Sequence, residues 1–69
     1  MKTGSDQVTV RGIPVLIEVL HEREDRWSWR FSAANGVNGC NAPGDLAPSE
    51  VQAFDRALDA AYRAIASTG

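Results

Sequence analysis

One stretch of the chain decides the fold: Arg26-Trp27-Ser28-Trp29-Arg30-Phe31-Ser32-Ala33. Apolar and polar residues alternate along it, and side chains on a β-strand point to opposite faces with a period of two. The odd-numbered positions therefore share an apolar face, and the even-numbered positions share a polar one. This pattern predicts a strand with one side on the core and the other side in water.

The sequence before this strand also alternates, but its parity changes at a glycine. Apolar positions before Gly12 are even-numbered, whereas those after it are odd-numbered. A β-bulge reverses the facing of all later residues, so the sequence predicts one long strand over 7–21, bent at Arg11-Gly12. The alternative is two short strands joined by a tight turn at Gly12. Pro14 lacks an amide donor, which favours an edge position for this strand.

A charged run at 22–26 predicts the tip of a hairpin. Two strands place their apolar faces on the same side of a sheet when the numbers of each pair of facing residues add up to an even value. A register in which these numbers add up to 48 leaves residues 23–25 as the loop. The resulting pairs include Val19 with Trp29, Ile17 with Phe31, Glu18 with Arg30 and Glu22 with Arg26. Opposite charges that face each other across strands stabilise this register by about 0.2–1 kcal/mol each.

A weak third strand is predicted at about 37–42. Asn35-Gly36 is a strong hairpin signal because both positions of such a turn need a positive φ. A two-residue turn at these positions pairs Phe31 with Cys40, whose side chain is then expected to be small, apolar and buried. Asn38-Gly39 offers a competing turn, so the sequence leaves the register of this strand open.

A helix is predicted from about Ser49. Ser49 and Gln52 have the spacing of a capping box, in which the serine hydroxyl accepts a backbone N–H of the first turn. The apolar stripe expected to face the core consists of Val51, Phe54, Leu58, Ala61 and Ile65. A stripe of small residues is expected to flank it: Ala53, Ala57, Ala60 and Ala64.

Together these elements predict an α+β fold. We expect a three-stranded antiparallel sheet, in the order 1-2-3, that is packed on one face by a C-terminal helix. Residues 7–66 form the single domain that a chain of 69 residues allows. Residues 1–6 are expected to be a flexible polar tail, and residues 67–69 to be the C-terminal end.

The composition offers little for catalysis or metal binding. The chain has one cysteine and one histidine, which excludes an internal disulfide and a zinc site built by one chain. In the predicted register, His21 and Cys40 lie about 13 Å apart, too far for a catalytic pair. We therefore expect a non-enzymatic protein without a cofactor. No stretch reaches about 18 apolar residues, so no membrane span is expected. The free thiol and the absence of a signal sequence favour the cytoplasm.

The polar side of the sheet is the best candidate site. It carries exposed leucines among charged groups, which is typical of a modest protein contact. The candidate partner-binding residues are Leu16, Glu18, Leu20, Arg26, Ser28 and Arg30. We expect them to bind another protein or a second copy of the chain. The alternative is a nucleic-acid binder that uses Arg26 and Arg30, although the net charge of −2 argues against it.

The two tryptophans, Trp27 and Trp29, have two interpretations. They could form a stacking platform for bases or sugars, or they could pack in the core. Core packing is favoured because Phe31 shares their strand face. Trp27 lies nearer the hairpin tip, so it is expected to be the more exposed of the two.

The order of motifs resembles a group of small proteins. Arg11-Gly12-Ile13, then Arg26-Trp27-Ser28-Trp29, then a Ser-capped, Ala-rich helix are similar to small uncharacterised proteins of Gram-negative bacteria and their mobile elements. The resemblance covers most of residues 8–66 and implies no particular activity. In size and slight acidity the chain also resembles phage-borne inhibitor proteins, including anti-CRISPR proteins, which is the second functional alternative.

Overall fold

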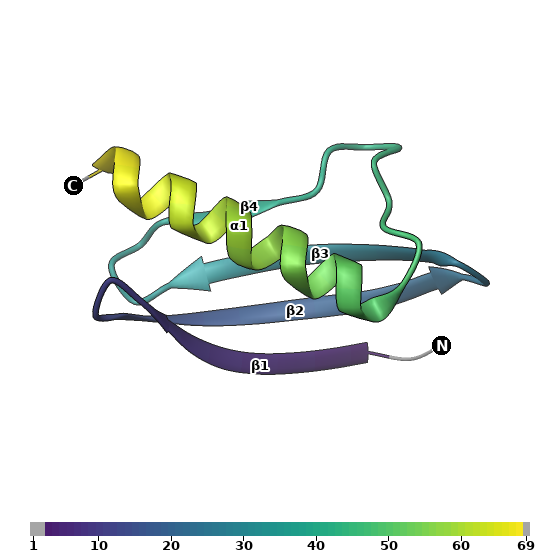
Figure 1. Cartoon of the computed structure of the whole chain (residues 1–69), viewed down its shortest axis with the longest axis horizontal. Helices are drawn as coiled ribbons and strands as arrows, with labels where there is room; N and C mark the ends of the chain where they lie inside the picture. The colour runs from purple at the N-terminus through teal and green to yellow at the C-terminus, as the bar shows by residue number, and fades with distance from the viewer. Residues whose placement is uncertain (1–2, 69) are drawn as a thin grey trace.

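A computed structural model describes residues 3–68 of the chain. Four strands precede one helix: β1 (Thr3–Val10), β2 (Ile13–Arg23), β3 (Arg26–Ala33), β4 (Asn38–Cys40) and α1 (Glu50–Thr68). The strands form one antiparallel sheet in the order β1-β2-β3-β4, and α1 crosses one of its faces (Figure 1). The α+β class and the C-terminal helix are confirmed, but the sheet has four strands and not three.

The extra strand arises at Arg11-Gly12, where the chain turns back on itself. Both residues have positive φ, 52° at Arg11 and 82° at Gly12, as a two-residue hairpin turn of type I′ requires. Val10 pairs with Ile13 across this turn. A two-residue turn changes the parity of the inward-facing positions just as a bulge does. The bent single strand was therefore the wrong choice between two solutions that share one sequence pattern.

The N-terminal strand includes residues that the sequence analysis placed in a polar tail. Residues 3–6 belong to β1, while residues 1–2 lie outside the described part of the chain. Asp6 pairs with Ile17 and Gly4 with Val19. Residues 3–6 show no apolar alternation that would predict a strand, and backbone pairing with β2 holds them in the extended conformation. At the other end, α1 continues to Thr68, beyond the expected limit at 66, and Gly69 lies outside the described residues.

Because β1 covers its flank, β2 is an interior strand, and the edge position expected for Pro14 is wrong. The Pro14 carbonyl accepts a hydrogen bond from Ala34 N–H at 2.9 Å. In a strand, the N and the carbonyl of one residue point to the same side. The missing proline N–H therefore faces the end of β3, whose last residue is Ala33. Pro14 fits an interior strand because it lies where the ladder with β3 stops.

The β2–β3 hairpin has the predicted register over most of its length. Val19 pairs with Trp29, Ile17 with Phe31 and Glu18 with Arg30. The tip differs, because the register shifts between His21 and Arg23 and Arg23 pairs with Arg26. The loop is thus shorter than expected, and Glu22 is the extra residue and does not face Arg26.

The β3–β4 register is displaced by one residue from the two-residue turn. Phe31 pairs with Gly39 and Arg30 pairs with Cys40. A side chain at position 39 would meet the Phe31 ring, because a Cβ placed there lies 2.8 Å from Phe31 Cε1. This register thus puts the residue without a side chain over Phe31. It also leaves Cys40 exposed, so its predicted burial is wrong.

Gly39→Ala is expected to destabilise the domain by about 1–3 kcal/mol, because the added methyl group overpacks against the buried Phe31. Urea unfolding followed by circular dichroism measures this loss. Gly12→Ala is not a suitable control, since φ is positive there. Asn38→Ala is, because its side chain is exposed on the same strand. Equal midpoints for the Gly39→Ala and Asn38→Ala variants would contradict the expected clash.

Helix α1 begins as the sequence predicts. Ser49 Oγ accepts the N–H of Gln52 at 3.2 Å, and the Ser49 carbonyl accepts the N–H of Ala53 at 2.9 Å. The face that it buries is shifted from the predicted one: Ala61 and Ile65 are buried as expected, and Phe54 and Leu58 pack against the core. Fully buried positions recur every four residues along the helix: Ala53, Ala57 and Ala61, followed by the nearly buried Ile65. Val51, expected in the core, is 70% exposed.

The small residues are therefore the centre of the contact and not its flank. Alanine side chains let α1 lie close to the sheet, where it packs chiefly against β3 and β2. Larger neighbours, Phe54 and Leu58, fill the space beside this stripe and stay partly exposed. The aromatic bulk of the core comes from β3, which supplies Trp27 and Phe31.

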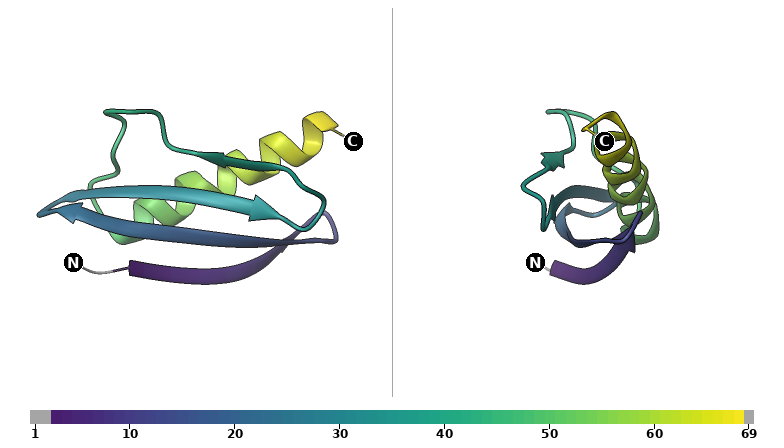
Figure 2. Two further views of the ribbon diagram at one scale, coloured as in Figure 1. Left: turned by 180° about the vertical axis from the view of Figure 1, so that it is seen from behind. Right: turned by 90° about the vertical axis from the view of Figure 1, so that its left-hand side faces the viewer.

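The molecule has two layers, and the helix covers one side of the sheet only. Figure 2 shows the sheet edge-on, with α1 on one side and no helix on the other. The buried side chains of the sheet lie on the α1 side: Val10, Val15, Ile17, Val19, Trp27, Phe31 and Ala33. We call the opposite side the open face. It is the surface on which the candidate site has to be judged.

Candidate functional site

Five of the six candidate residues lie on the open face. Strand alternation places them there, opposite the buried positions of β2 and β3. They are Leu16, Glu18 and Leu20 from β2, and Ser28 and Arg30 from β3. Backbone pairing sets Glu18 opposite Arg30 and Leu20 opposite Ser28. The sixth residue, Arg26, is exposed at the tip of the hairpin.

The open face combines leucines with a shallow hollow. Leu16 lies in the middle of the sheet and is 41% exposed, and Leu20 is half-buried. Beside Leu20 lies a hollow of about 320 Å³, whose walls include Glu18, Ser28 and Arg30. Residues of β1, among them Ser5, close it on the other side. The apolar part of this surface is thus bordered by charged and hydroxyl groups.

The charged groups of the open face are paired with each other. Arg30 Nε donates to Glu18 Oε1 at 2.9 Å. This hydrogen bond and the negative charge of Glu18 raise the pKa of the Arg30 guanidinium above its usual value. Ser28 Oγ donates to Glu22 Oε2 at 2.8 Å. Glu18 and Glu22 thus each have a hydrogen-bond partner on this surface, and only Glu18 is paired with a cation among the described contacts.

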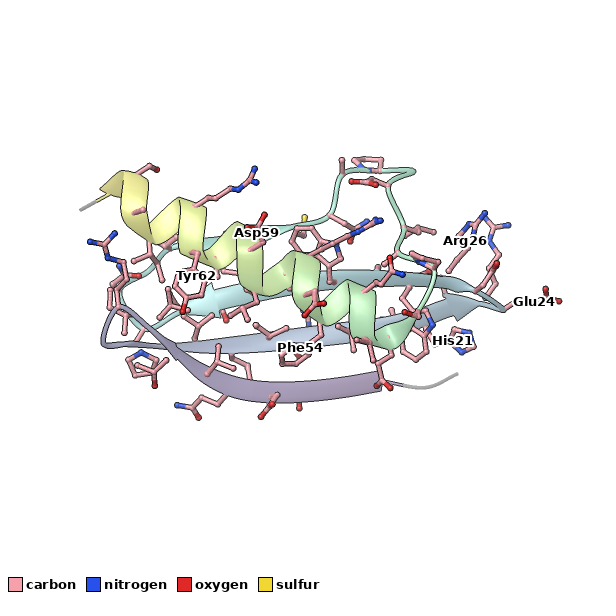
Figure 3. All side chains as sticks on the ribbon, viewed as in Figure 1. His21, Glu24, Arg26, Phe54, Asp59 and Tyr62 are labelled. Carbon is pink, nitrogen blue, oxygen red and sulfur yellow. The ribbon has the colours of Figure 1, made fainter. Side chains whose placement is uncertain are left out.

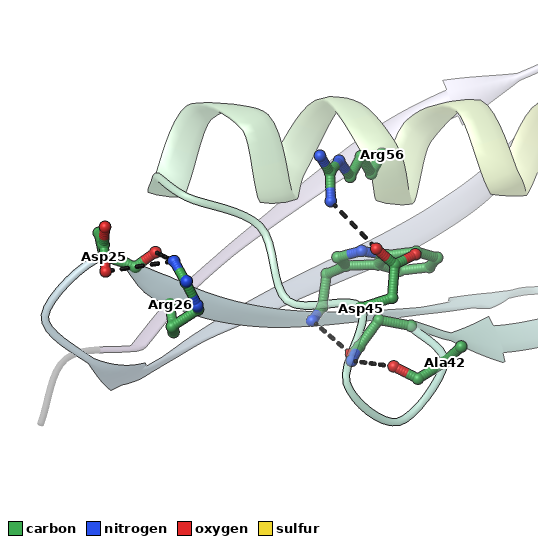
Figure 4. A network of polar contacts seen from close by, with 7 residues as sticks. Asp25, Arg26, Ala42, Asp45 and Arg56 are labelled. Atoms are coloured by element: carbon green, nitrogen blue, oxygen red, sulfur yellow. Dashed lines mark hydrogen bonds and ion pairs between the residues drawn. The ribbon is translucent and has the colours of Figure 1, made fainter.

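Arg26 does not extend the charged row of the open face. Its Nη1 atom lies 3.2 Å from Asp25 Oδ1 and donates to the Asp25 carbonyl at 3.1 Å. Figure 4 shows this pair at the hairpin tip, apart from the contact that joins Asp45 on the loop to Arg56 on α1. Both arginines of the candidate set are therefore already bound to carboxylates of the same chain.

The tryptophans lie on the covered side of the sheet. Trp27 is 8% exposed and Trp29 is half-buried, so the expectation that Trp27 is the more exposed of the two is wrong. Two contacts explain its burial. Ala47 pairs with Trp27 through two backbone hydrogen bonds of 2.8 Å. The His21 ring stacks on Trp27 with a centroid distance of 4.5 Å (His21 is labelled in Figure 3).

The titratable side chains are not gathered into a metal site. Among residues 3–68, no group of three or more His, Cys, Asp or Glu is placed so that it could hold a metal ion. His21 Nε2 lies 2.7 Å from the Glu24 carbonyl at the hairpin tip. Cys40 lies opposite Arg30 in the strand beyond β3. The structure thus keeps the only histidine and the only cysteine of the chain on different strand pairs.

A second hollow was missed by sequence reasoning. It measures about 350 Å³ and lies between β1 and the first turns of α1. Its apolar walls are Val19, Val51 and Phe54, and Figure 3 shows Phe54 pointing from α1 toward the sheet. Three carboxylates surround it: Asp6, Glu50 and Asp55. The sequence signal for this hollow was the apolar Val51 with acidic residues next to it. The sequence analysis assigned Val51 to the core instead.

Comparisons of the chain with protein families, with curated proteins and with solved structures give no match. In the part of the chain that the structure describes, no helix is long and apolar enough to cross a membrane. The fold therefore defines only a class, an antiparallel sheet with one C-terminal helix against it, and function has to be argued from surfaces.

Proposed function

We propose that this protein is a non-enzymatic binding module whose open face docks against another protein. The observation that carries the proposal is the 41% exposure of Leu16 in the middle of an uncovered sheet. Leu20 lies four residues further along β2, on the same face. Contact surfaces between proteins have such an apolar centre and a polar rim, which Glu18, Arg30 and Ser28 supply here.

The charges of this face indicate what kind of protein surface fits it. Glu22 accepts only a serine hydroxyl among the described contacts, so its negative charge has no cation beside it there. We infer a partner with apolar side chains opposite the leucines and a basic group beside Glu22. The Glu18–Arg30 pair can stay intact in such a contact, because each charge is already neutralised.

Nucleic-acid binding through Arg26 and Arg30 is the competing proposal. It requires guanidinium groups that are free to neutralise phosphates. Arg30 would have to leave Glu18, and Arg26 would have to leave Asp25. These two ion pairs favour a protein as the partner. An inhibitor that acts by binding a protein, the second alternative, would use the open face in the same way.

The test compares variants in a capture experiment with purified protein as bait. Leu16→Lys with Leu20→Lys is expected to lower affinity for the captured protein by at least about tenfold, because two apolar contacts are replaced by charges that have to be desolvated. The matched control is Tyr62→Lys with Ser67→Lys, two exposed positions on α1. Circular dichroism first establishes that both double variants are folded.

The outcomes separate the two classes of partner. A captured protein that survives nuclease treatment, is lost with the leucine variant and is retained with the α1 variant supports the proposal. Equal capture by both variants would contradict the use of the open face. Capture of nucleic acid that nuclease abolishes, with an affinity that falls as salt rises, would establish the arginine-based alternative instead.

A further inference from the structure

Strand β1 is a long edge of the sheet. It spans Thr3–Val10 and pairs with β2 on one side only. The opposite edge strand, β4, spans only Asn38–Cys40. Proteins usually protect an exposed edge with proline, lysine, a bulge, a covering element or an inward-pointing charge, and of these β1 carries the charge of Asp6, which pairs with the buried Ile17. Neither proline nor lysine occurs between positions 3 and 10, and α1 packs chiefly over β2 and β3.

The backbone groups on the outer side of β1 can be identified from the pairing. The Pro14 carbonyl accepts a hydrogen bond from the Ala34 N–H on the β3 side. The even-numbered residues of β2 therefore point their backbone groups toward β3. The odd-numbered residues of β2 therefore face β1, where they pair with even-numbered residues. This leaves the N–H and carbonyl groups of Ser5, Gln7 and Thr9 directed away from the sheet.

Among the described residues, one of these outer groups has a local partner. Gln7 N–H donates to Asp6 Oδ1 at 2.9 Å, an interaction between chain neighbours. This bond confirms that the Gln7 N–H is not used by β2. A pairing strand would exchange it for a carbonyl and release the Asp6 carboxylate to water.

We propose that two copies of this protein associate through antiparallel pairing of β1 with β1, around a two-fold axis at Gln7. The two sheets then form one continuous sheet of eight strands, with both open faces on the same side. This interface uses the edge of the sheet and not the open face, so it is independent of the proposed function.

The register follows from the outer groups and from charge. The residues whose backbone groups point outward are odd-numbered, and they must pair with one another across the two copies. The residue numbers of each pair therefore add up to an even value. A sum of 12 sets Asp6 directly against Asp6 of the second copy, which is unfavourable. A sum of 14 sets Gln7 against Gln7 and Asp6 against Val8. Of the registers that do not place the two Asp6 side chains against each other, the one with a sum of 14 pairs the most residues of β1, namely 4–10.

This register also brings opposite charges together. It sets Val10 of the second copy against Gly4, so that Arg11 of the second copy comes beside Thr3, the first residue of β1. A Cβ placed on Gly4 would lie 2.9 Å from Glu50 Oε2, so Glu50 lies over this part of the strand. Arg11 of the second copy thus arrives beside the hollow bordered by Asp6, Glu50 and Asp55.

Arg11 itself fits this role. It is exposed and occupies a left-handed conformation, φ 52°, which a residue with a Cβ adopts at a cost. Asparagine or glycine would fit the turn with less strain. Either replacement would remove the positive charge of Arg11. In the paired sheet, that charge lies beside the carboxylates of Asp6, Glu50 and Asp55.

The decisive experiment measures the mass of the full chain by sedimentation over a range of concentrations. We expect a monomer–dimer equilibrium. Gln7→Pro removes the outer N–H while leaving the bonds to β2 intact, and should weaken the dimer by at least about tenfold. Gln7→Thr keeps the N–H and should leave the dimer unchanged. Arg11→Asn removes the charge that meets the carboxylates at Asp6, Glu50 and Asp55 and should weaken the dimer.

A cross-link tests the register and remains informative if Gln7→Pro does not fold. In a Cys40→Ser background, Gln7→Cys places two thiols on the two-fold axis, where paired Cα atoms are about 5.5 Å apart. Mild oxidation should give a covalent dimer. Thr9→Cys in the same background should not cross-link, because Thr9 faces Ser5 of the second copy.

Three results would overturn the proposal. The wild-type protein could remain a monomer at every concentration, or Thr9→Cys could cross-link as readily as Gln7→Cys. The dimer could also persist in a folded Gln7→Pro variant and be lost in the Leu16→Lys, Leu20→Lys variant. That last result would assign self-association to the open face and would leave the β1 edge without a partner.

Discussion

Replacing Ile17 by alanine is expected to remove most of the stability of the domain, so that a measurable fraction of the protein is unfolded at room temperature. Ile17 is fully buried, and its strand β2 lies in the interior of the sheet. Removing its side chain costs about 2–5 kcal/mol, since apolar burial is lost and a cavity remains. A domain of this size has only about 3–5 kcal/mol of stability. Thermal and urea unfolding, followed by circular dichroism, measure the loss.

The neighbouring leucine provides the control for this prediction. Leu16→Ala removes a side chain of similar size from the open face, where 41% of the residue is exposed. We expect a loss well below that of Ile17→Ala, about 1 kcal/mol or less. If both variants lost the same amount, the assignment of inner and outer faces on β2 would be wrong.

Replacing Ala57 by leucine is expected to destabilise the protein by about 1–3 kcal/mol or more. Ala57 is fully buried in the middle of the stripe on which α1 rests. Three further carbon atoms at that point force α1 away from β3 and separate the packed surfaces on both sides. Hydrogen exchange of the helix amides should rise together with the loss measured in urea.

A leucine elsewhere on the helix separates packing from helix propensity. Ala66 is exposed, and leucine is nearly as good a helix former as alanine. Ala66→Leu is therefore expected to change stability by less than about 0.5 kcal/mol. Comparable losses for both variants would contradict close contact between α1 and the sheet at Ala57.

The sequence predicted the centre of the fold because both of its faces were specified. Between β2 and β3, the apolar residues had to share one side, and the opposite charges of Glu18 and Arg30 had to meet on the other. Two independent requirements selected one register. The same reasoning placed five candidate residues on the open face before their contacts were known.

Where only one requirement was available, the prediction failed. The parity change at Gly12 is compatible with a bulge or with a two-residue turn, and only the tertiary structure distinguishes them. At β4 the deciding fact was the lack of space above Phe31, which favours Gly39 there and exposes Cys40. No local pattern encodes that contact.

The face of the helix was misjudged because hydrophobicity was weighted above size. Val51 and Phe54 are more apolar than Ala53 and Ala57, yet the alanines are buried. A helix that lies close to a flat sheet needs small residues at the centre of its contact. Because α1 turns its alanines toward the sheet, Val51 stays exposed. Val51 then lines the acidic hollow beside β1.

The order of the strands has a kinetic consequence. Each strand pairs with the next one along the chain, so the sheet can grow hairpin by hairpin without closing a long loop. Domains whose sheets join neighbouring segments fold faster than domains whose sheets join distant ones. The long β2–β3 hairpin is the natural starting point. Because α1 packs chiefly on β2 and β3, it can dock before the outer strands complete the sheet.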